Sequence, residues 1–197
     1  MDKKQRSGSN LHLIQQGKTD GLSCESFLNG CRLGDAKAQK AVYDLLSPKM
    51  FSLCLRYMGN REDAEDTLQE GFVTLFSKIG SYSGEGSFEG WARKIFVNTA
   101  LMSLRKKDLL KNSEELDGIR EVAGSGVTQL QKIGYAELMG MIRSLPSGYR
   151  TVFNMYVVEG YSHREISKAL GISEVTSRSQ LLRARAMMKD KIENEKH

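Results

Sequence analysis

The sequence predicts an all-α protein built from two small helical domains joined by a flexible linker, the second a helix-turn-helix domain. Apolar residues recur at three- and four-residue steps through residues 35–107 and again through 133–192, which is the periodicity of amphipathic helices. No segment alternates apolar and polar residues as a half-buried strand does. The stretch 108–132 mixes acidic residues, serine and glycine, a composition typical of an interdomain linker.

Composition and charge exclude several classes of protein. The chain has 197 residues with 29 Lys and Arg against 24 Asp and Glu, a formal net charge of +5, and 40% hydrophobic residues. Its longest apolar run, residues 155–158, is far shorter than the ~20 residues that cross a bilayer, and MDKKQRSGSN at the amino terminus lacks the apolar core of a signal peptide. The three cysteines and three histidines show no metal or redox spacing. We therefore expect a cytoplasmic protein without membrane insertion, metal or cofactor.

The amino-terminal part is expected to contain a polar tail and four helical segments. Residues 1–29 have the composition of a flexible tail, and an apolar stripe begins near Asp35. Pro48 is expected to end or kink the first helix, after which the stripe resumes. Asn60 follows a glycine and is placed to cap the third segment. The elements expected next are a helix to residue 79, a glycine-rich loop over 80–87 and a helix over 88–107.

The carboxy-terminal part carries the pattern of a helix-turn-helix. Ser162 and Glu165 have the spacing of a capping box, in which a hydroxyl and a carboxylate three residues apart satisfy the first backbone N–H groups of a helix. Gly171 is placed to stop that short helix, and Ser173 to cap a longer one that follows. Two further helices are expected to precede them, around 135–144 and 148–159.

The charge of this motif suits DNA. Residues 164–191 hold seven basic and three acidic side chains, and basic contacts to phosphates release condensed counterions. The second helix of such a motif enters the major groove, where residues near its start meet base edges. The residues expected on that side are Thr176, Arg178, Ser179 and Leu182. The alternative is an ordinary solvated basic helix in a bundle.

A separate acidic surface is expected in the amino-terminal domain. Residues 61–70 hold five acidic side chains and one arginine. Acidic residues in a first helical turn stabilise the helix dipole, but Asp66, Gln69 and Glu70 lie beyond that turn. Their spacing indicates a polar patch that docks on a basic partner. Metal binding is the weaker alternative, because no histidine or glycine-turn ligand accompanies them.

The following helix has the opposite charge. Residues 85–107 hold five basic and two acidic side chains, with Lys94, Asn98 and Arg105 on one face. A basic face with an amide donor, next to a glycine-rich loop that carries Tyr82, suits single-stranded DNA. For the neighbouring Phe88 and Trp91 the residues themselves favour core packing.

Three segments in this order resemble a known family. They are DAEDTLQEGFVTLF, FEGWARKIFVNTALMSLRKK and GYSHREISKALGISE. They resemble the two conserved domains of a bacterial sigma factor, and the short linker is similar to that of the extracytoplasmic-function (ECF) group of the sigma-70 family. The resemblance implies sigma domain 2 over 30–107 and sigma domain 4 over 133–197.

The resemblance implies a non-enzymatic subunit that binds core RNA polymerase and opens promoter DNA. Binding to the coiled coil of the largest subunit falls on Asp66, Leu68, Gln69 and Glu70. Holding the melted −10 strand falls on Tyr82, Trp91, Lys94, Asn98 and Arg105. Reading the −35 duplex falls on Ser173, Thr176, Arg178, Ser179, Leu182 and Arg183, in a domain that also docks on the polymerase flap. An anti-sigma partner is a further implied class of partner.

The sequence departs from the family pattern at three positions. Val175 stands where glycine is usual, Gln180 where arginine is usual, and Met102 where an acidic residue is frequent. The first two changes raise the hypothesis that another DNA-bound factor helps to place the subunit. Two alternatives of other classes stay open: a stand-alone helix-turn-helix regulator, and a nucleic-acid enzyme with the carboxylates of 62–70 as metal ligands.

Overall fold

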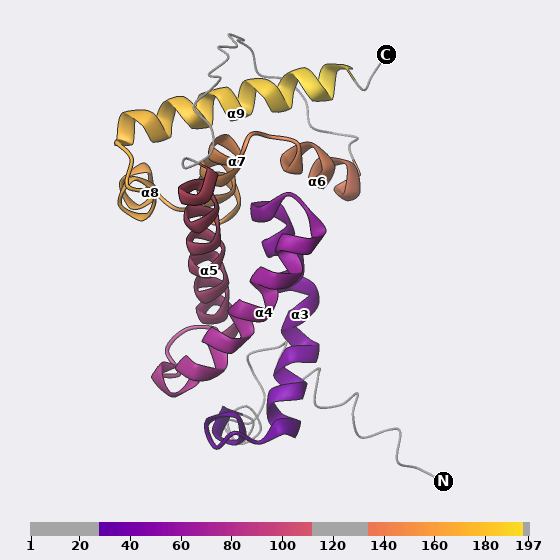
Figure 1. The fold of residues 1–197 in the computed structure, drawn as a ribbon, viewed down its shortest axis with the longest axis vertical. Coiled ribbons are helices and arrows are strands. Elements are labelled where there is room, and N and C mark those ends of the chain that lie inside the picture. Colours follow the sequence, from indigo (N-terminus) through magenta and orange to yellow (C-terminus); the bar gives the residue numbers. More distant parts are fainter. Residues whose placement is uncertain (1–27, 112–133, 195–197) are drawn as a thin grey trace. The chain divides into compact units, whose positions relative to one another are not determined.

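The computed structural model describes residues 28–111 and 134–194, and all regular structure within these ranges is helical, as predicted (Figure 1). A helical turn over 28–32 comes first. The elements that follow are α3 (Ala36–Met58), α4 (Arg61–Lys78), the 3-10 helix η1 (Ile79–Ser81), α5 (Phe88–Lys111), α6 (Tyr135–Arg143), α7 (Ser147–Phe153), the π-helical segment η2 (Asn154–Val158), α8 (His163–Leu170) and α9 (Glu174–Asn194).

These elements form two compact units. The first takes the chain up to Leu53 together with Glu65–Thr99, and the second takes Cys54–Ala64 with the chain from Ala100 onward. Most of the predicted linker, residues 108–132, and most of the predicted tail, residues 1–29, lie outside the described residues.

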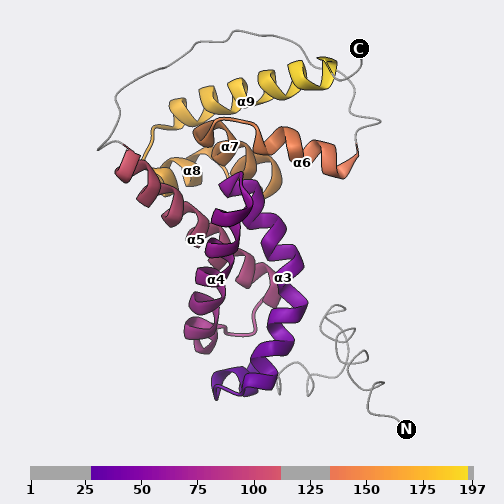
Figure 2. The ribbon, with the colours of Figure 1, turned by 45° about the vertical axis from the view of Figure 1, so that its right-hand side comes forward.

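The first unit is a packing of α3, α4 and α5, which lie side by side in Figures 1 and 2. Its fully buried side chains include Leu46 and Met50 of α3, Leu75 of α4 and Phe96 of α5. The approach of α4 to α5 is close at Gly71, where a Cβ atom would overlap the ring of Phe96. Only a residue without a side chain fits at this position.

Helix α3 passes through Pro48 without ending. The sequence predicted an end or a kink here, because proline lacks the N–H group that an interior helical residue donates, at a cost of about 3 kcal/mol. Leu46 and Met50 on either side of the proline are fully buried in the same core. Burial of each is worth about 1.5–3 kcal/mol, so packing offsets the missing hydrogen bond.

The predicted boundary between α3 and α4 is confirmed. Gly59 has φ +85°, the left-handed conformation that ends a helix. The backbone N–H of Asp63 then donates to Asn60 Oδ1 at 2.9 Å, which makes Asn60 the cap of α4. Helix α5 runs four residues beyond the predicted end at Lys107, through a segment without glycine or proline.

The second unit contains the helix-turn-helix. In Figures 1 and 2 the long helix α9 crosses α7, and α8 lies at the end of α9 where that helix begins. Its apolar core joins α6 and α9, with Phe153 and Tyr149 packed against it. The buried members of this core are Met141, Ile142, Leu145, Ala184 and Met188.

A buried arginine joins two helix ends in this unit. Arg150 Nε donates to Tyr57 O at 3.0 Å and Nη2 donates to Met58 O at 3.1 Å, at the carboxy-terminal end of α3. Its Nη1 donates to Arg143 O and Leu145 O, both at 2.9 Å, at the end of α6. Burial lowers the pKa of Arg150 from its ordinary value. The four carbonyl acceptors, which carry the negative ends of two helix dipoles, compensate for this desolvation.

The segment after α7 forms a wider turn than the single helix predicted over 148–159. The N–H of Glu159 donates to Asn154 O at 2.9 Å, a five-residue step. The side chain of Asn154 is fully buried, and its Nδ2 donates to Arg56 O at 3.0 Å. Because a contact far away in the sequence holds this turn, local periodicity did not reveal it.

Candidate nucleic-acid interface

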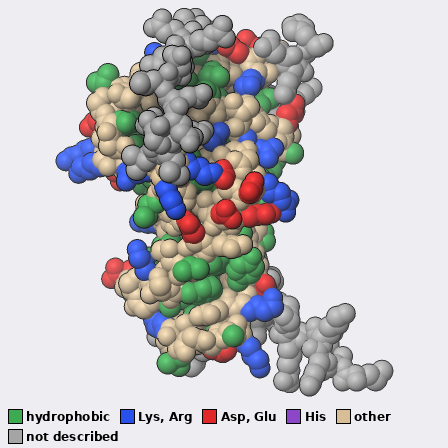
Figure 3. All heavy atoms as spheres, viewed as in Figure 1, with side chains coloured by type: hydrophobic (Ala, Val, Ile, Leu, Met, Phe, Trp, Pro, Cys, Tyr) green, Lys and Arg blue, Asp and Glu red, His purple; other side chains and the backbone are tan. Residues whose placement is uncertain are grey.

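Helix α4 presents the acidic surface that the sequence predicted, defined here as Asp66, Gln69 and Glu70. All three side chains are exposed, at the three- and four-residue steps that place them on one face. Leu68, which belongs to the same predicted set, is buried instead. It supports the helix from inside, because it lies on the same face as the buried residues Ala64 and Phe72, four positions before and after it. Figure 3 shows acidic side chains gathered next to Lys and Arg side chains on the face in view.

The loop between α4 and α5 is held by a cluster of three aromatic rings. The ring of Tyr82 lies 5.3 Å from that of Phe88 and 5.4 Å from that of Trp91, measured between centroids. The Tyr82 hydroxyl donates to Gly86 O at 2.8 Å, and Arg32 Nη2 donates to Tyr82 O at 3.0 Å. These bonds fix the loop.

The three rings differ in exposure, and this changes their roles. Tyr82 and Phe88 are buried, while Trp91 is half-buried. Tyr82 therefore does not offer a free ring on which a base could stack in this structure, and it shapes the loop from within. The core packing expected for Phe88 is confirmed, whereas Trp91 keeps part of its ring at the surface.

Helix α5 carries the predicted basic face. Lys94 and Asn98 are exposed, four residues apart, and Trp91 lies one turn before them. Arg105, further along the helix and in the second unit, is also exposed. It lines a pocket of about 200 Å³ whose walls include Leu104 of α5 and residues of α7 and α9.

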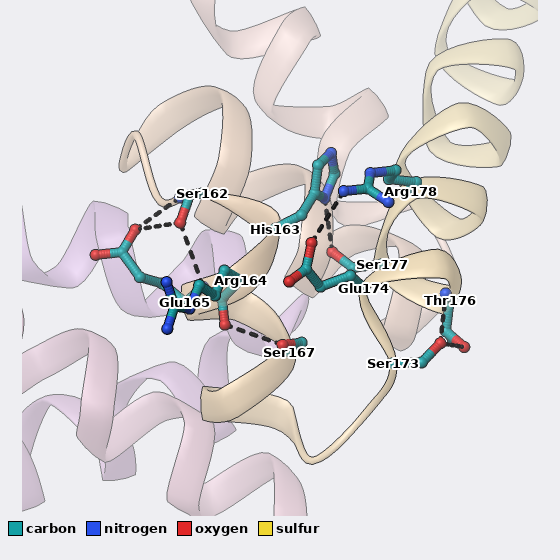
Figure 4. Close-up of polar contacts among 10 residues, drawn as sticks. All are labelled: Ser162, His163, Arg164, Glu165, Ser167, Ser173, Glu174, Thr176, Ser177 and Arg178. Atoms are coloured by element: carbon teal, nitrogen blue, oxygen red, sulfur yellow. Dashed lines mark hydrogen bonds and ion pairs between the residues drawn. The ribbon is translucent and has the colours of Figure 1, made fainter.

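The helix-turn-helix is built on the predicted caps (Figure 4). The N–H of Glu165 donates to Ser162 Oγ at 3.3 Å, and the N–H of Ser162 donates to Glu165 Oε2 at 2.8 Å, which confirms the capping box. Gly171 ends α8 with φ +70°. The N–H of Thr176 donates to Ser173 Oγ at 2.9 Å, so Ser173 caps α9 as predicted. The turn between the helices is thus fixed at both ends.

A histidine that the sequence did not single out joins α8 to α9. His163 Nδ1 lies 2.9 Å from Ser177 Oγ (Figure 4). The ring of His163 also stacks on that of Tyr156, with 4.5 Å between the centroids. Burial and the cations of Arg178 and Arg185 lower the pKa of His163, and Glu174 opposes them. Its position in the first turn of a capped helix gave no signal for this role.

The side chains of α9 divide between scaffold and surface. Ser173 and Thr176 are hydrogen-bonded to each other at the cap, and Arg183 Nη1 donates to the Tyr149 hydroxyl at 3.2 Å. Arg178, Ser179 and Leu182 are exposed, as predicted for a face that meets DNA. Arg178 also pairs with Glu174 at 2.9 Å, one turn back on the helix.

The structure shows the surroundings of the three residues that depart from the family pattern. Gln180 is half-buried and lies beside Gly148 of α7, where a Cβ atom would be 3.6 Å from its Nε2. Val175 is exposed in the first turn of α9. Met102 is exposed on α5, and nothing in the structure explains the loss of an acidic side chain there.

Within residues 28–111 and 134–194, no three His, Cys, Asp or Glu side chains are grouped so that they could hold a metal ion. Across the same residues, none of the helices has the length and apolar character to span a membrane.

Comparison with known proteins assigns both parts of the chain. The family model Sigma-70 region 2 matches residues 42–109, and the model Sigma-70, region 4 matches residues 135–188. Similar curated proteins include the ECF RNA polymerase sigma factor SigE of Mycolicibacterium smegmatis, 28% identical over 92% of this chain and 75% of that protein. The ECF RNA polymerase sigma factor SigW of Bacillus subtilis is 27% identical over 81% of this chain and 91% of that protein.

A solved structure agrees at the level of the fold. The sigma factor RpoE from Bartonella quintana, crystallised with the anti-sigma factor NepR, matches with a TM-score of 0.50 at 18% identity, over 78% of this chain and 96% of that chain. Both conserved regions are thus present, in the predicted order. The chain belongs to the ECF group of the sigma-70 family, the sigma factors that direct promoter-specific transcription.

Proposed function

We propose that this chain binds core RNA polymerase through the acidic surface of α4. The partner expected from the family is the coiled coil of the largest subunit. Asp66, Gln69 and Glu70 offer two carboxylates and an amide on one exposed face, a match for a basic helical surface. Leu68 contributes from the core by holding α4 in place.

The basic face of α5 is proposed to hold the melted −10 strand. Lys94 and Arg105 neutralise phosphates, Asn98 offers donor and acceptor atoms to an unpaired base, and Trp91 offers the exposed part of its ring for stacking. Tyr82 acts from inside the loop. The subunit orients and opens DNA, while the chemistry of RNA synthesis belongs to the polymerase.

The second domain is proposed to dock on the polymerase flap and to place α9 in the major groove of the −35 element. Arg178, Ser179 and Leu182 supply the exposed contacts, with Arg183 supported by Tyr149. Ser173 and Thr176 fix the start of the helix, so their contribution is the cap. An anti-sigma partner and a second DNA-bound factor stay predictions.

One observation carries the proposal: within the first unit, the part of α4 that bears the acidic surface packs against the part of α5 that bears Lys94 and Asn98, so surfaces of opposite charge lie on neighbouring helices. The rings of Phe72 in α4 and Phe96 in α5 lie 5.1 Å apart in an edge-on contact. A rigid pair of helices can therefore hold a protein with one face and a separated DNA strand with the other.

The polymerase contact is tested by charge reversal. Asp66→Arg and Glu70→Arg are expected to abolish co-purification with core RNA polymerase while the circular dichroism spectrum stays unchanged. Asp44→Arg makes the same change on an exposed part of α3 and is the control, expected to bind normally. Normal association of both α4 variants would refute this assignment.

The strand contact is tested by promoter opening. Lys94→Ala and Asn98→Ala are expected to leave polymerase association intact and to lower the permanganate reactivity of −10 thymines. Lys37→Ala removes an exposed lysine from α3 as the control. If Lys94→Ala lost polymerase association instead, the two surfaces would have been assigned in the wrong order.

A further inference from the structure

Helix α9 exposes two large apolar side chains on its charged face. Val175 is 71% exposed and Leu182 is 68% exposed, although the other bulky apolar residues of this helix pack inward. The two are seven residues apart, which places them on the same face about 10 Å from each other along the axis. Both sit on a helix that is otherwise polar toward solvent.

The surroundings of Val175 fit a polyanion. Arg178 lies one turn further along the same face, and Arg185 extends the basic stripe toward the end of the helix. From α8, Arg164 and Lys168 are exposed as well. An apolar protein groove would have to desolvate these cations, whereas a nucleic-acid groove lined by phosphates complements them.

Within the major groove, one base has an apolar group on its edge. Thymine presents its C5-methyl group, and apolar side chains contact it. Val175 suits such a contact because its branched side chain has restricted rotamers and reaches solvent at the start of the helix, where base edges are met. The polar residues nearby on this turn, Ser173 and Thr176, are bonded to each other.

We propose that Val175 is a specificity-determining residue that selects thymine, through its C5-methyl group, at one position of the upstream promoter duplex. This inference rests on the proposed promoter-binding function. Val175 stands where glycine is usual in the family, so its branched side chain adds a base preference to the recognition helix.

The experiment compares thymine with deoxyuridine, which lacks only this methyl group. The probe is a duplex selected from a randomised library by the holoenzyme, with each upstream thymine replaced in turn. One position is expected to lose about fourfold in affinity on replacement, equivalent to about 0.8 kcal/mol for one buried methyl-sized group. With Val175→Ala the same replacement is expected to have no effect, so the two changes are coupled.

Val157→Ala is the matched control, because it truncates an exposed valine of η2 outside α9. It should keep the full discrimination between thymine and deoxyuridine. If Val175→Ala keeps that discrimination at every position, or weakens polymerase association instead, the inference is wrong while the proposed function stands. If no holoenzyme forms or no duplex is selected, the proposed function and this inference fail together.

Discussion

The close approach of α4 to α5 makes Gly71→Ala a test of how the two charged surfaces are held. Alanine favours a helix interior over glycine by about 1 kcal/mol, so the exchange would stabilise an open site. Here the added methyl group overlaps the fully buried ring of Phe96. Phe72 packs edge-on against that ring and restricts its movement. Overpacking costs about 1–3 kcal/mol, and the upper end applies because the ring cannot move away. After the gain of about 1 kcal/mol in helix preference, the free energy of unfolding should fall by about 2 kcal/mol.

The assay is denaturant unfolding followed by tryptophan fluorescence. Trp91 is the single tryptophan of the chain and lies in the first unit, so its signal reports on the helices concerned. The midpoint should fall with little change in slope. Phe96→Leu in the same chain should recover part of the loss, because the smaller side chain makes room for the methyl group.

Gly140→Ala is the control, since a Cβ atom at this position of α6 meets nothing within 4 Å. Followed by circular dichroism, it is expected to be neutral or stabilising by up to about 1 kcal/mol. A Gly71→Ala protein as stable as the original would refute the argument from close packing.

Three further predictions concern the second unit and the core. The pKa of His163 is lowered, so near pH 6.5 the folded domain binds fewer protons than the unfolded chain, and the protein loses stability as the pH falls below about 6.5. Between pH 7.5 and pH 5.5 the melting temperature of the original protein should therefore drop more than that of the His163→Gln variant. Burial raises the pKa of Cys54 to about 12, so iodoacetamide at pH 8 should modify this thiol only after the protein unfolds. Peptide mass spectrometry would detect the modification, and labelling of Cys54 in the folded protein would contradict the prediction. Arg150→Met should lower the free energy of unfolding by at least about 3 kcal/mol, because buried carbonyls lose their donor, and an unchanged urea midpoint would count against this role.

Local features of the fold could be predicted from the sequence. The caps at Asn60 and Ser173, the capping box at Ser162 and the stop at Gly171 depend on residues within three positions of each other, and all four are confirmed. The acidic and basic faces follow from helical periodicity alone. In each of these cases the type and the spacing of residues within about one helical turn determine the local structure.

Features that depend on distant parts of the chain could not be predicted. Pro48 stays inside α3 because the core buries the residues around it. Tyr82 was expected to offer its ring to single-stranded DNA, yet packing places it inside. The wide turn at Asn154 depends on the backbone of Arg56, and the exposure of Val175 depends on which face of α9 the neighbouring helices cover.

The hydrogen bonds of Arg150 have a consequence for how the protein can be divided. Its acceptors at Tyr57 and Met58 precede the stretch 112–133, while Arg150 itself follows it. A protease that cuts within that stretch would therefore break the covalent chain but leave the buried hydrogen bonds from Arg150 to Tyr57 O and Met58 O in place. The two fragments should then elute together from a size-exclusion column.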